Sequence, residues 1–261
     1  MPSSPDSVPA GGLFVRSGEG IRANLVRVAT ASWAFCAYFP VGVMYLNMLL
    51  MLLALAAVPH LGSRLRKVRQ SPLWAPVAFM VGWTFLAAAV GAWTPDTATR
   101  LFHIARVALL LFMGLLLTPS EVRISVISFL VASLLAALVV AAHHIWGLPA
   151  WDIWGSLLTS RNNFSSGNMI TMATAFGICL FLALRRGSTP AEALLAGAAA
   201  LALGVTVALH AESRNAQLLL LAQAVAAVLF WFRSPRPILA GMAAVAVLVA
   251  ALWQLSPVMQ A

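Results

Sequence analysis

Charged residues are scarce in this sequence. Of its 261 residues, 9% are charged and 62% are hydrophobic, and the mean hydropathy is +0.93. A chain with so little charge would not stay soluble as a globular domain, which excludes a water-soluble enzyme or binding module. Its long apolar runs predict an all-α polytopic membrane protein.

Cysteine and acidic residues are also few. Cys36 and Cys179 both fall inside apolar runs, so a disulfide framework is not indicated, and no Cys/His spacing suggests zinc. No two of the seven acidic residues lie within four positions of each other. The sequence therefore has no local carboxylate pair to hold magnesium or to act as a glycosidase pair, and it predicts neither a metal nor a cofactor.

The basic residues exceed the acidic ones and give a formal net charge of +9. Such a charge can indicate nucleic-acid binding, but here the basic residues are dispersed among short segments between apolar runs, which is typical of membrane insertion. We therefore predict contact with membrane lipid and no nucleic-acid partner. Arg64, Arg66, Lys67 and Arg69 form the densest basic cluster, and the positive-inside rule assigns this loop to the cytoplasm.

The chain divides into a tail and a helical region. Residues 1–23 are rich in Pro, Ser and Gly and predict a flexible cytoplasmic tail. Residues 24–261 form the predicted transmembrane domain. Its first apolar run, 26–58, is too long for one span of roughly 20 residues and contains Pro40, so it predicts two short helices in a hairpin. Seven further helices are predicted at 73–93, 100–118, 124–146, 167–184, 191–210, 217–232 and 238–255.

These nine helices place the N-terminus in the cytoplasm and Ala261 outside, with every dense basic cluster on the inner side. Four arginines then fall on or below the outer surface: Arg100, Arg106, Arg161 and Arg214. An arginine near the bilayer centre costs on the order of 3 kcal/mol. Arg100, His103 and Arg106 are spaced i, i+3 and i+6, which predicts a polar stripe lining a water-filled cavity.

The other two arginines have polar neighbours. Asn162 and Asn163 follow Arg161, and Ser213 precedes Arg214. Because the planar guanidinium group suits phosphate and carboxylate, we predict that the four arginines bind a lipid-linked phosphate at the outer leaflet. Supporting contacts are expected from Asn162, Asn163, Ser213 and His103. In the alternative interpretation, the arginines pair with acidic residues of the same face, namely Asp96, Asp152 and Glu212.

Two short patterns carry a family resemblance. Arg161-Asn162-Asn163 is followed by Gly167-Asn168-Met169, and Ser213-Arg214-Asn215 comes one helical hairpin later. This order resembles that of bacterial O-antigen ligases and O-antigen polymerases, as does the early Pro40 hairpin with Asn47 in its second arm. The resemblance implies a multi-pass glycosyltransferase of the bacterial inner membrane, with a periplasmic C-terminus. Without a metal, it would transfer a glycan from undecaprenyl diphosphate to lipid A-core oligosaccharide, or to a growing polymer, in lipopolysaccharide or surface polysaccharide assembly.

The sequence departs from that family in one respect. After about the ninth helix, the ligases carry a large periplasmic segment with a histidine that is proposed to activate the acceptor hydroxyl. This chain reaches Ala261 where that segment would begin. The resemblance therefore predicts an incomplete form with little or no transferase activity by itself, and a partner encoded downstream that supplies the C-terminal half.

The histidines of this chain do not clearly replace the missing base. His210 is the nearest substitute, because it lies four residues from Arg214. His143 and His144 point about 100° apart on a helix, which predicts an interfacial polar role for them. Two other functional classes stay open, an anion or lipid transporter and a non-catalytic membrane subunit.

Overall fold

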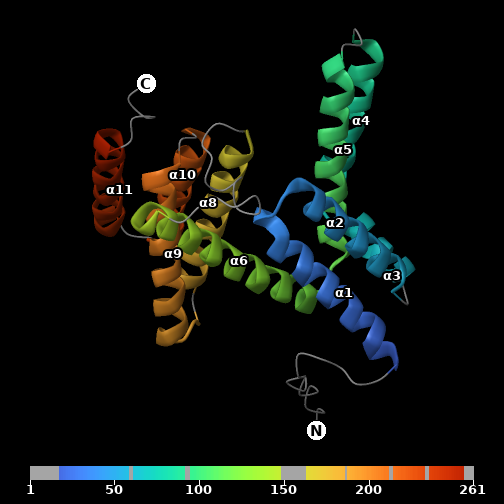
Figure 1. The fold of residues 1–261 in the computed structure, drawn as a ribbon, viewed down its shortest axis with the longest axis horizontal. Helices are drawn as coiled ribbons and strands as arrows, with labels where there is room; N and C mark the ends of the chain where they lie inside the picture. Colours follow the sequence, from blue (N-terminus) through green and yellow to red (C-terminus); the bar gives the residue numbers. More distant parts are fainter. Residues whose placement is uncertain are drawn as a thin grey trace. The chain divides into compact units, whose positions relative to one another are not determined.

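The computed structural model describes residues 18–58, 61–91, 95–147, 163–185, 187–211, 214–232 and 235–255. These residues form ten α-helices and one short 3-10 helix, with no β-strand among them (Figure 1). The predicted all-α fold is confirmed for this part of the chain. Residues 1–17, which make up most of the predicted tail, lie outside it, and so does Ala261.

The N-terminal helices are α1 (Gly18–Phe35), η1 (Cys36–Tyr38), α2 (Val41–Ala56) and α3 (Leu61–Gln70). The predicted break at Pro40 is confirmed, because η1 ends before it and α2 begins after it. The tail was predicted to end at residue 23, but α1 already begins at Gly18.

The basic cluster at residues 64–69 was predicted to be a loop, and this prediction is wrong. The cluster lies on α3. Leu61, Arg64 and Val68 share one face at i, i+3 and i+7, with Val68 buried, whereas Arg66, Lys67 and Arg69 are exposed. One apolar face is enough to support a short helix even in a basic segment.

The remaining seven helices agree with the predicted ranges to within about five residues. They are α4 (Trp74–Val90), α5 (Pro95–Leu116), α6 (Pro119–Trp146), α8 (Asn163–Leu184), α9 (Pro190–His210), α10 (Arg214–Trp231) and α11 (Pro235–Leu255). Four of them begin at a proline. This position suits proline, since the first residue of a helix does not need its backbone N–H within the helix.

The chain folds as two compact units. Unit 1 comprises residues up to Trp33 together with 46–125, and unit 2 comprises 34–45 together with 126–261. The core of unit 1 consists of larger apolar side chains, namely Val26, Met51, Leu55, Val58, Val68, Met113 and Leu116. Helix α4 packs against α5 but buries none of its residues, so its apolar surface faces outward.

Unit 2 is built around α8, which packs against both α9 and α10. Many of its core residues are alanines, including Ala132, Ala136, Ala173, Ala175, Ala200 and Ala216. Small residues let helices approach closely in a membrane. Gly204 illustrates this, because a Cβ added to it would lie 3.1 Å from Cε2 of Phe176.

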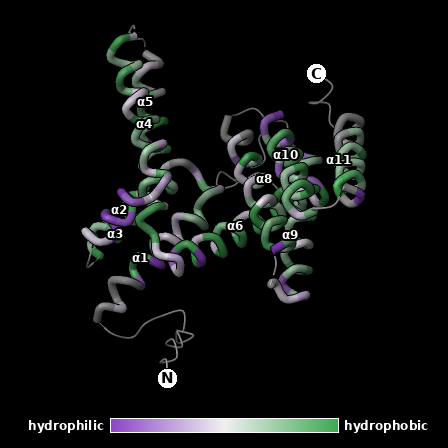
Figure 2. Tube along the Cα trace, turned by 180° about the vertical axis from the view of Figure 1, so that it is seen from behind, coloured by the Kyte–Doolittle hydropathy of each residue, from purple (hydrophilic) through white to green (hydrophobic). Residues whose placement is uncertain are grey.

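The structure supports a membrane protein. Figure 2 shows hydrophobic residues along most of the helices, and many of them are exposed, such as Phe230 at 88% and Val90 at 81%. Four helices are long and apolar enough to cross a membrane, namely α6, α9, α10 and the part of α8 from Gly167 to Leu184. Counting the bent pair α2–α3 as one span gives five in the described part of the chain. The predicted number of nine is not confirmed, because helices such as α4, with 17 residues, are short.

Candidate functional site

Three helix termini meet at one end of unit 2. The segment between α8 and α9 is short, and Gly187 adopts a φ of +89° within it. Thr189 then caps α9: its hydroxyl accepts the N–H of Glu192 at 3.2 Å, and its own N–H donates to the Glu192 carboxylate at 3.0 Å. This tight reversal makes α8 and α9 antiparallel (Figure 1). The first turn of α8, the last turn of α9 and the first turn of α10 therefore share one end of unit 2, which we call the arginine end.

A buried glutamine holds the corner between α9 and α10. Gln217 is 1% exposed, and its Nε2 donates to the carbonyl of Ala211 at 3.0 Å. The N–H of Ala211 in turn donates to the carbonyl of Val207 at 3.0 Å. Together these bonds tie the first turn of α10 to the end of α9, which keeps His210 and Arg214 at one corner.

Two histidines from different helices stack at the same end. The rings of His144, on α6, and His210, on α9, are 4.0 Å apart at their centroids and inclined by 12°. His143 contacts His144 edge-on, with centroids 5.4 Å apart. Ring nitrogens carry their lone pairs in the plane of the ring, so the lone pairs of two parallel stacked rings do not converge on one ion. This arrangement suits hydrogen bonding or proton acceptance more than metal binding.

No three His, Cys, Asp or Glu residues in the described part of the chain gather as a possible metal site. The arginine end instead combines two stacked imidazoles with one guanidinium group. Such groups can bind an anion and can accept a proton from a hydroxyl.

The structure describes only some of the predicted phosphate-binding residues. Arg214 is exposed on the first turn of α10. Asn163 is the first residue of α8, but its side chain is not described, and Arg161, Asn162 and Ser213 lie outside the described residues.

The stripe of Arg100, His103 and Arg106 lies on α5, as its spacing predicted. This helix belongs to unit 1, whereas His210 and Arg214 belong to unit 2. His103 is exposed, and the centroid of its ring lies 6.0 Å from that of Phe102. Arg106 is half-buried, and the side chain of Arg100 is not described. The alternative pairing with acidic residues stays untested, because Asp152 and Glu212 lie outside the described residues and the side chain of Asp96 is not described.

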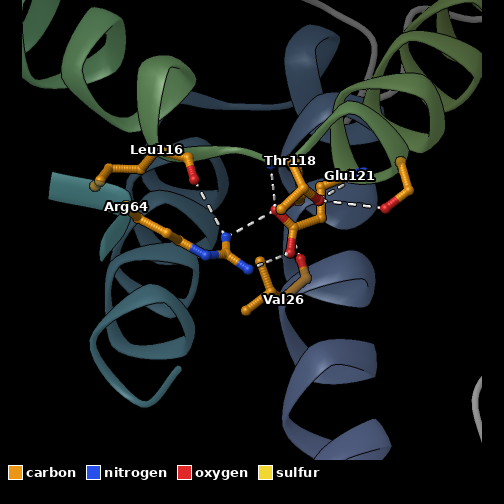
Figure 3. A network of polar contacts seen from close by, with 7 residues as sticks. Val26, Arg64, Leu116, Thr118 and Glu121 are labelled. Carbon is orange, nitrogen blue, oxygen red and sulfur yellow. Dashed lines mark hydrogen bonds and ion pairs between the residues drawn. The ribbon is translucent and has the colours of Figure 1, made fainter. Parts of the chain in front are cut away.

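A bidentate ion pair lies in unit 1, where α5 passes into α6. Arg64 binds both carboxylate oxygens of Glu121, at 2.9 and 3.1 Å, and also donates to the carbonyl of Leu116 at 3.2 Å (Figure 3). The same carboxylate accepts the N–H of Thr118 at 2.7 Å and so caps α6. Glu121 is 2% exposed, so this pair is a structural tether, whereas the sequence had predicted Arg64 only as part of a basic cytoplasmic loop.

Comparison of the chain with protein-family models, curated proteins and solved structures finds no match of any of the three kinds. The resemblance to O-antigen ligases therefore rests on the short motifs alone. Two features of the arginine end were not predicted from the sequence, namely the buried Gln217 and the stacked pair of His144 and His210. Gln217 could have been recognised in the sequence, because it is a polar residue in an apolar helix, three positions after Arg214. Nothing in the sequence indicates that His144 pairs with His210.

Proposed function

We propose that this chain is a bacterial inner-membrane protein that binds a lipid-linked glycan diphosphate at the arginine end of unit 2, as O-antigen ligases and polymerases do. The observation that supports the proposal is the meeting of three helix termini at that end. The first turn of α8 directly follows Arg161-Asn162, and the first turn of α10 carries Arg214. The α8 terminus that follows Arg161-Asn162 in the sequence and the α10 terminus that carries Arg214 therefore lie at the same end of one bundle.

The chemistry follows from where charge develops. Transfer of the glycan breaks the bond between its anomeric carbon and undecaprenyl diphosphate, and it forms a bond from that carbon to an acceptor hydroxyl of lipid A-core oligosaccharide. Negative charge grows on the leaving diphosphate, which is weakly basic and needs no general acid. Arg161 and Arg214 would bind the diphosphate at this end, whereas the predicted contribution of Arg100 and Arg106, on α5 of unit 1, is not part of this proposal.

The acceptor hydroxyl must also lose its proton. His210 is the candidate base within this chain, and its stacking on His144 would fix the orientation of its ring. A base supplied by a partner protein is the alternative, and in that case this chain supplies the diphosphate site.

Binding to a short-chain polyprenyl diphosphate tests the proposal. We expect the purified protein in nanodiscs to bind the diphosphate more tightly than the matching polyprenol. Arg214→Ala should weaken diphosphate binding by about tenfold or more, because charge-assisted contacts are lost. Arg214→Lys should be nearly as harmful, since lysine lacks the planar fork. Arg236→Ala is the matched control, because Arg236 is also exposed in unit 2 but lies at the start of α11.

Equal binding of diphosphate and alcohol, or an equal loss in Arg236→Ala, would contradict the proposal. Activity is a separate test, in which the chain is expressed in a ligase-null strain, alone and together with a candidate partner protein. We expect any lipopolysaccharide ladders to disappear when Arg214→Ala is present at an equal membrane level. Diphosphate binding without ladders in any combination would identify a non-catalytic subunit, and anion flux into vesicles would identify a transporter.

A further inference from the structure

A groove of about 820 Å³ lies between α8 and α10. Its walls are almost entirely apolar and include Ile178, Leu180, Phe181, Leu184, Ala226 and Phe230. Two of the aromatic side chains are strongly exposed, Phe181 at 68% and Phe230 at 88%. An elongated apolar groove on a membrane helix pair suits a hydrocarbon chain.

One end of the groove lies at the end of unit 2 opposite the arginine end. Arg185 directly follows α8, Trp231 ends α10, and both line the groove. Arg185 is exposed and is the single charged residue among the lining residues that the structure describes. Tryptophan and arginine at a helix end are typical of the membrane interface, where lipid headgroups lie.

The backbone at the mouth of the groove is held in place. The N–H of Ser188 donates to the carbonyl of Arg185 at 3.4 Å, and its hydroxyl donates to the carbonyl of Leu182 at 3.2 Å. Farther along the groove, Gly177 and Gln223 line it and contact each other closely. Gly177 and Arg185 are eight residues apart, so the groove extends about 12 Å along α8 between them.

We propose that this groove binds one acyl chain of an anionic phospholipid, whose phosphate lies against Arg185. The apolar walls match the chain, and the cation at the mouth matches the headgroup charge. Basic pockets between transmembrane helices are known to recognise anionic headgroups in this way. The site is separate from the proposed diphosphate site, because it lies at the other end of α8 and α10 and needs no glycan.

Lipid retention measures the site directly. The protein is purified in mild detergent, supplied with phosphatidylglycerol or phosphatidylcholine of identical chains, and examined by native mass spectrometry. We expect a bound phosphatidylglycerol that survives mild activation, with weaker retention of phosphatidylcholine. Arg185→Gln should reduce retention of phosphatidylglycerol by about tenfold, to the level of phosphatidylcholine.

Two further variants distinguish the contribution of the Arg185 charge to lipid binding from that of the shape of the groove. Ala227→Trp would fill the groove and should abolish the retention of both lipids. Arg236→Gln removes an exposed cation of the same unit that does not line the groove, and it should leave retention unchanged. An unchanged preference in Arg185→Gln, or an equal loss in Arg236→Gln, would overturn the proposal.

A photoactivatable phosphatidylglycerol tests the unaltered protein, so the result does not depend on any variant folding. After cross-linking and proteolysis, we expect labelled peptides from residues 174–185 and 223–231. Addition of inorganic phosphate should not reduce the labelling, because the acyl chain supplies much of the affinity. Labels confined to other helices would show that the groove is not the lipid site.

Discussion

Unit 1 and unit 2 are stabilised by different kinds of interaction. In unit 1, a nearly buried carboxylate, Glu121, binds Arg64 and caps α6 at the same time. In unit 2, the core is rich in alanine, and glycines such as Gly204 and Gly241 contact side chains of neighbouring helices. Unit 1 thus adds a directed ion pair to a core of large apolar side chains, whereas unit 2 packs small residues closely.

This difference predicts which kind of substitution destabilises each unit. A buried ion pair contributes little over an apolar pair of the same shape, but loss of one partner leaves a buried charge without its counter-ion. Close packing of small residues is lost when a methyl group is added where there is no space for it. Unit 1 should therefore be sensitive to loss of charge, and unit 2 to gain of volume. Hydrogen exchange measured on peptides of each unit separates the two effects.

The largest effect is expected from Glu121→Ala. It leaves Arg64 without its carboxylate and removes the acceptor of the Thr118 N–H from the cap of α6, so unit 1 should lose about 3 kcal/mol of stability. Peptides from α3 and from residues 109–125 should exchange faster, while peptides from α8 to α10 stay unchanged. Glu121→Gln keeps an acceptor for the Thr118 N–H and should lose less. Equal acceleration in both units would contradict the assignment of this ion pair to unit 1.

Gly241→Ala should have the next largest effect. An added Cβ would lie 2.7 Å from Cγ1 of Val228, and a β-branched side chain cannot easily turn away. We expect a loss of about 2 kcal/mol, seen as faster exchange in α10 and α11. Adding Val228→Ala should restore much of it.

Gly197→Ala is the matched control, because nothing lies within 4 Å of the position where its Cβ would be. It should leave the exchange of unit 2 unchanged or slightly slower, since alanine favours a helix more than glycine does. If Gly197→Ala proved as harmful as Gly241→Ala, close packing would not be what distinguishes unit 2.

The smallest effect is expected from Tyr38→Phe, which removes a polar contact from the closely packed unit. Its hydroxyl donates to the Ser133 hydroxyl at 2.8 Å, while Ser133 itself donates to the carbonyl of Phe129 at 2.8 Å. Because Ser133 keeps a partner and the tyrosine ring still stacks on Phe129, unit 2 should lose only about 1 kcal/mol. The measurement is thermal unfolding in detergent beside the unaltered protein. A loss as large as that of Glu121→Ala would mean that unit 2 also depends on polar contacts.

The candidate site was only partly predictable. The sequence indicated Arg214 and His210 as neighbours, because they lie four positions apart across a helix boundary. It could not indicate that His144 stacks on His210, since α6 and α9 are separated by a whole helix and the polarity of one helix does not reveal which helix it contacts. The groove that includes Arg185 was missed for the same reason, because its walls come from α8 and α10 and neither helix alone differs from any other apolar helix.

Local composition determined the membrane character of this chain and the positions of its long helices. Hydrophobic runs, prolines at helix starts and basic residues at helix ends act over a few residues, so their effects can be read along the chain. Only the tertiary structure decided that Arg64 lies in a buried ion pair while Arg66 is exposed, and that Gln217 closes the α9–α10 corner. Those outcomes depend on which helix faces meet, and this is set by contacts between residues far apart in the sequence.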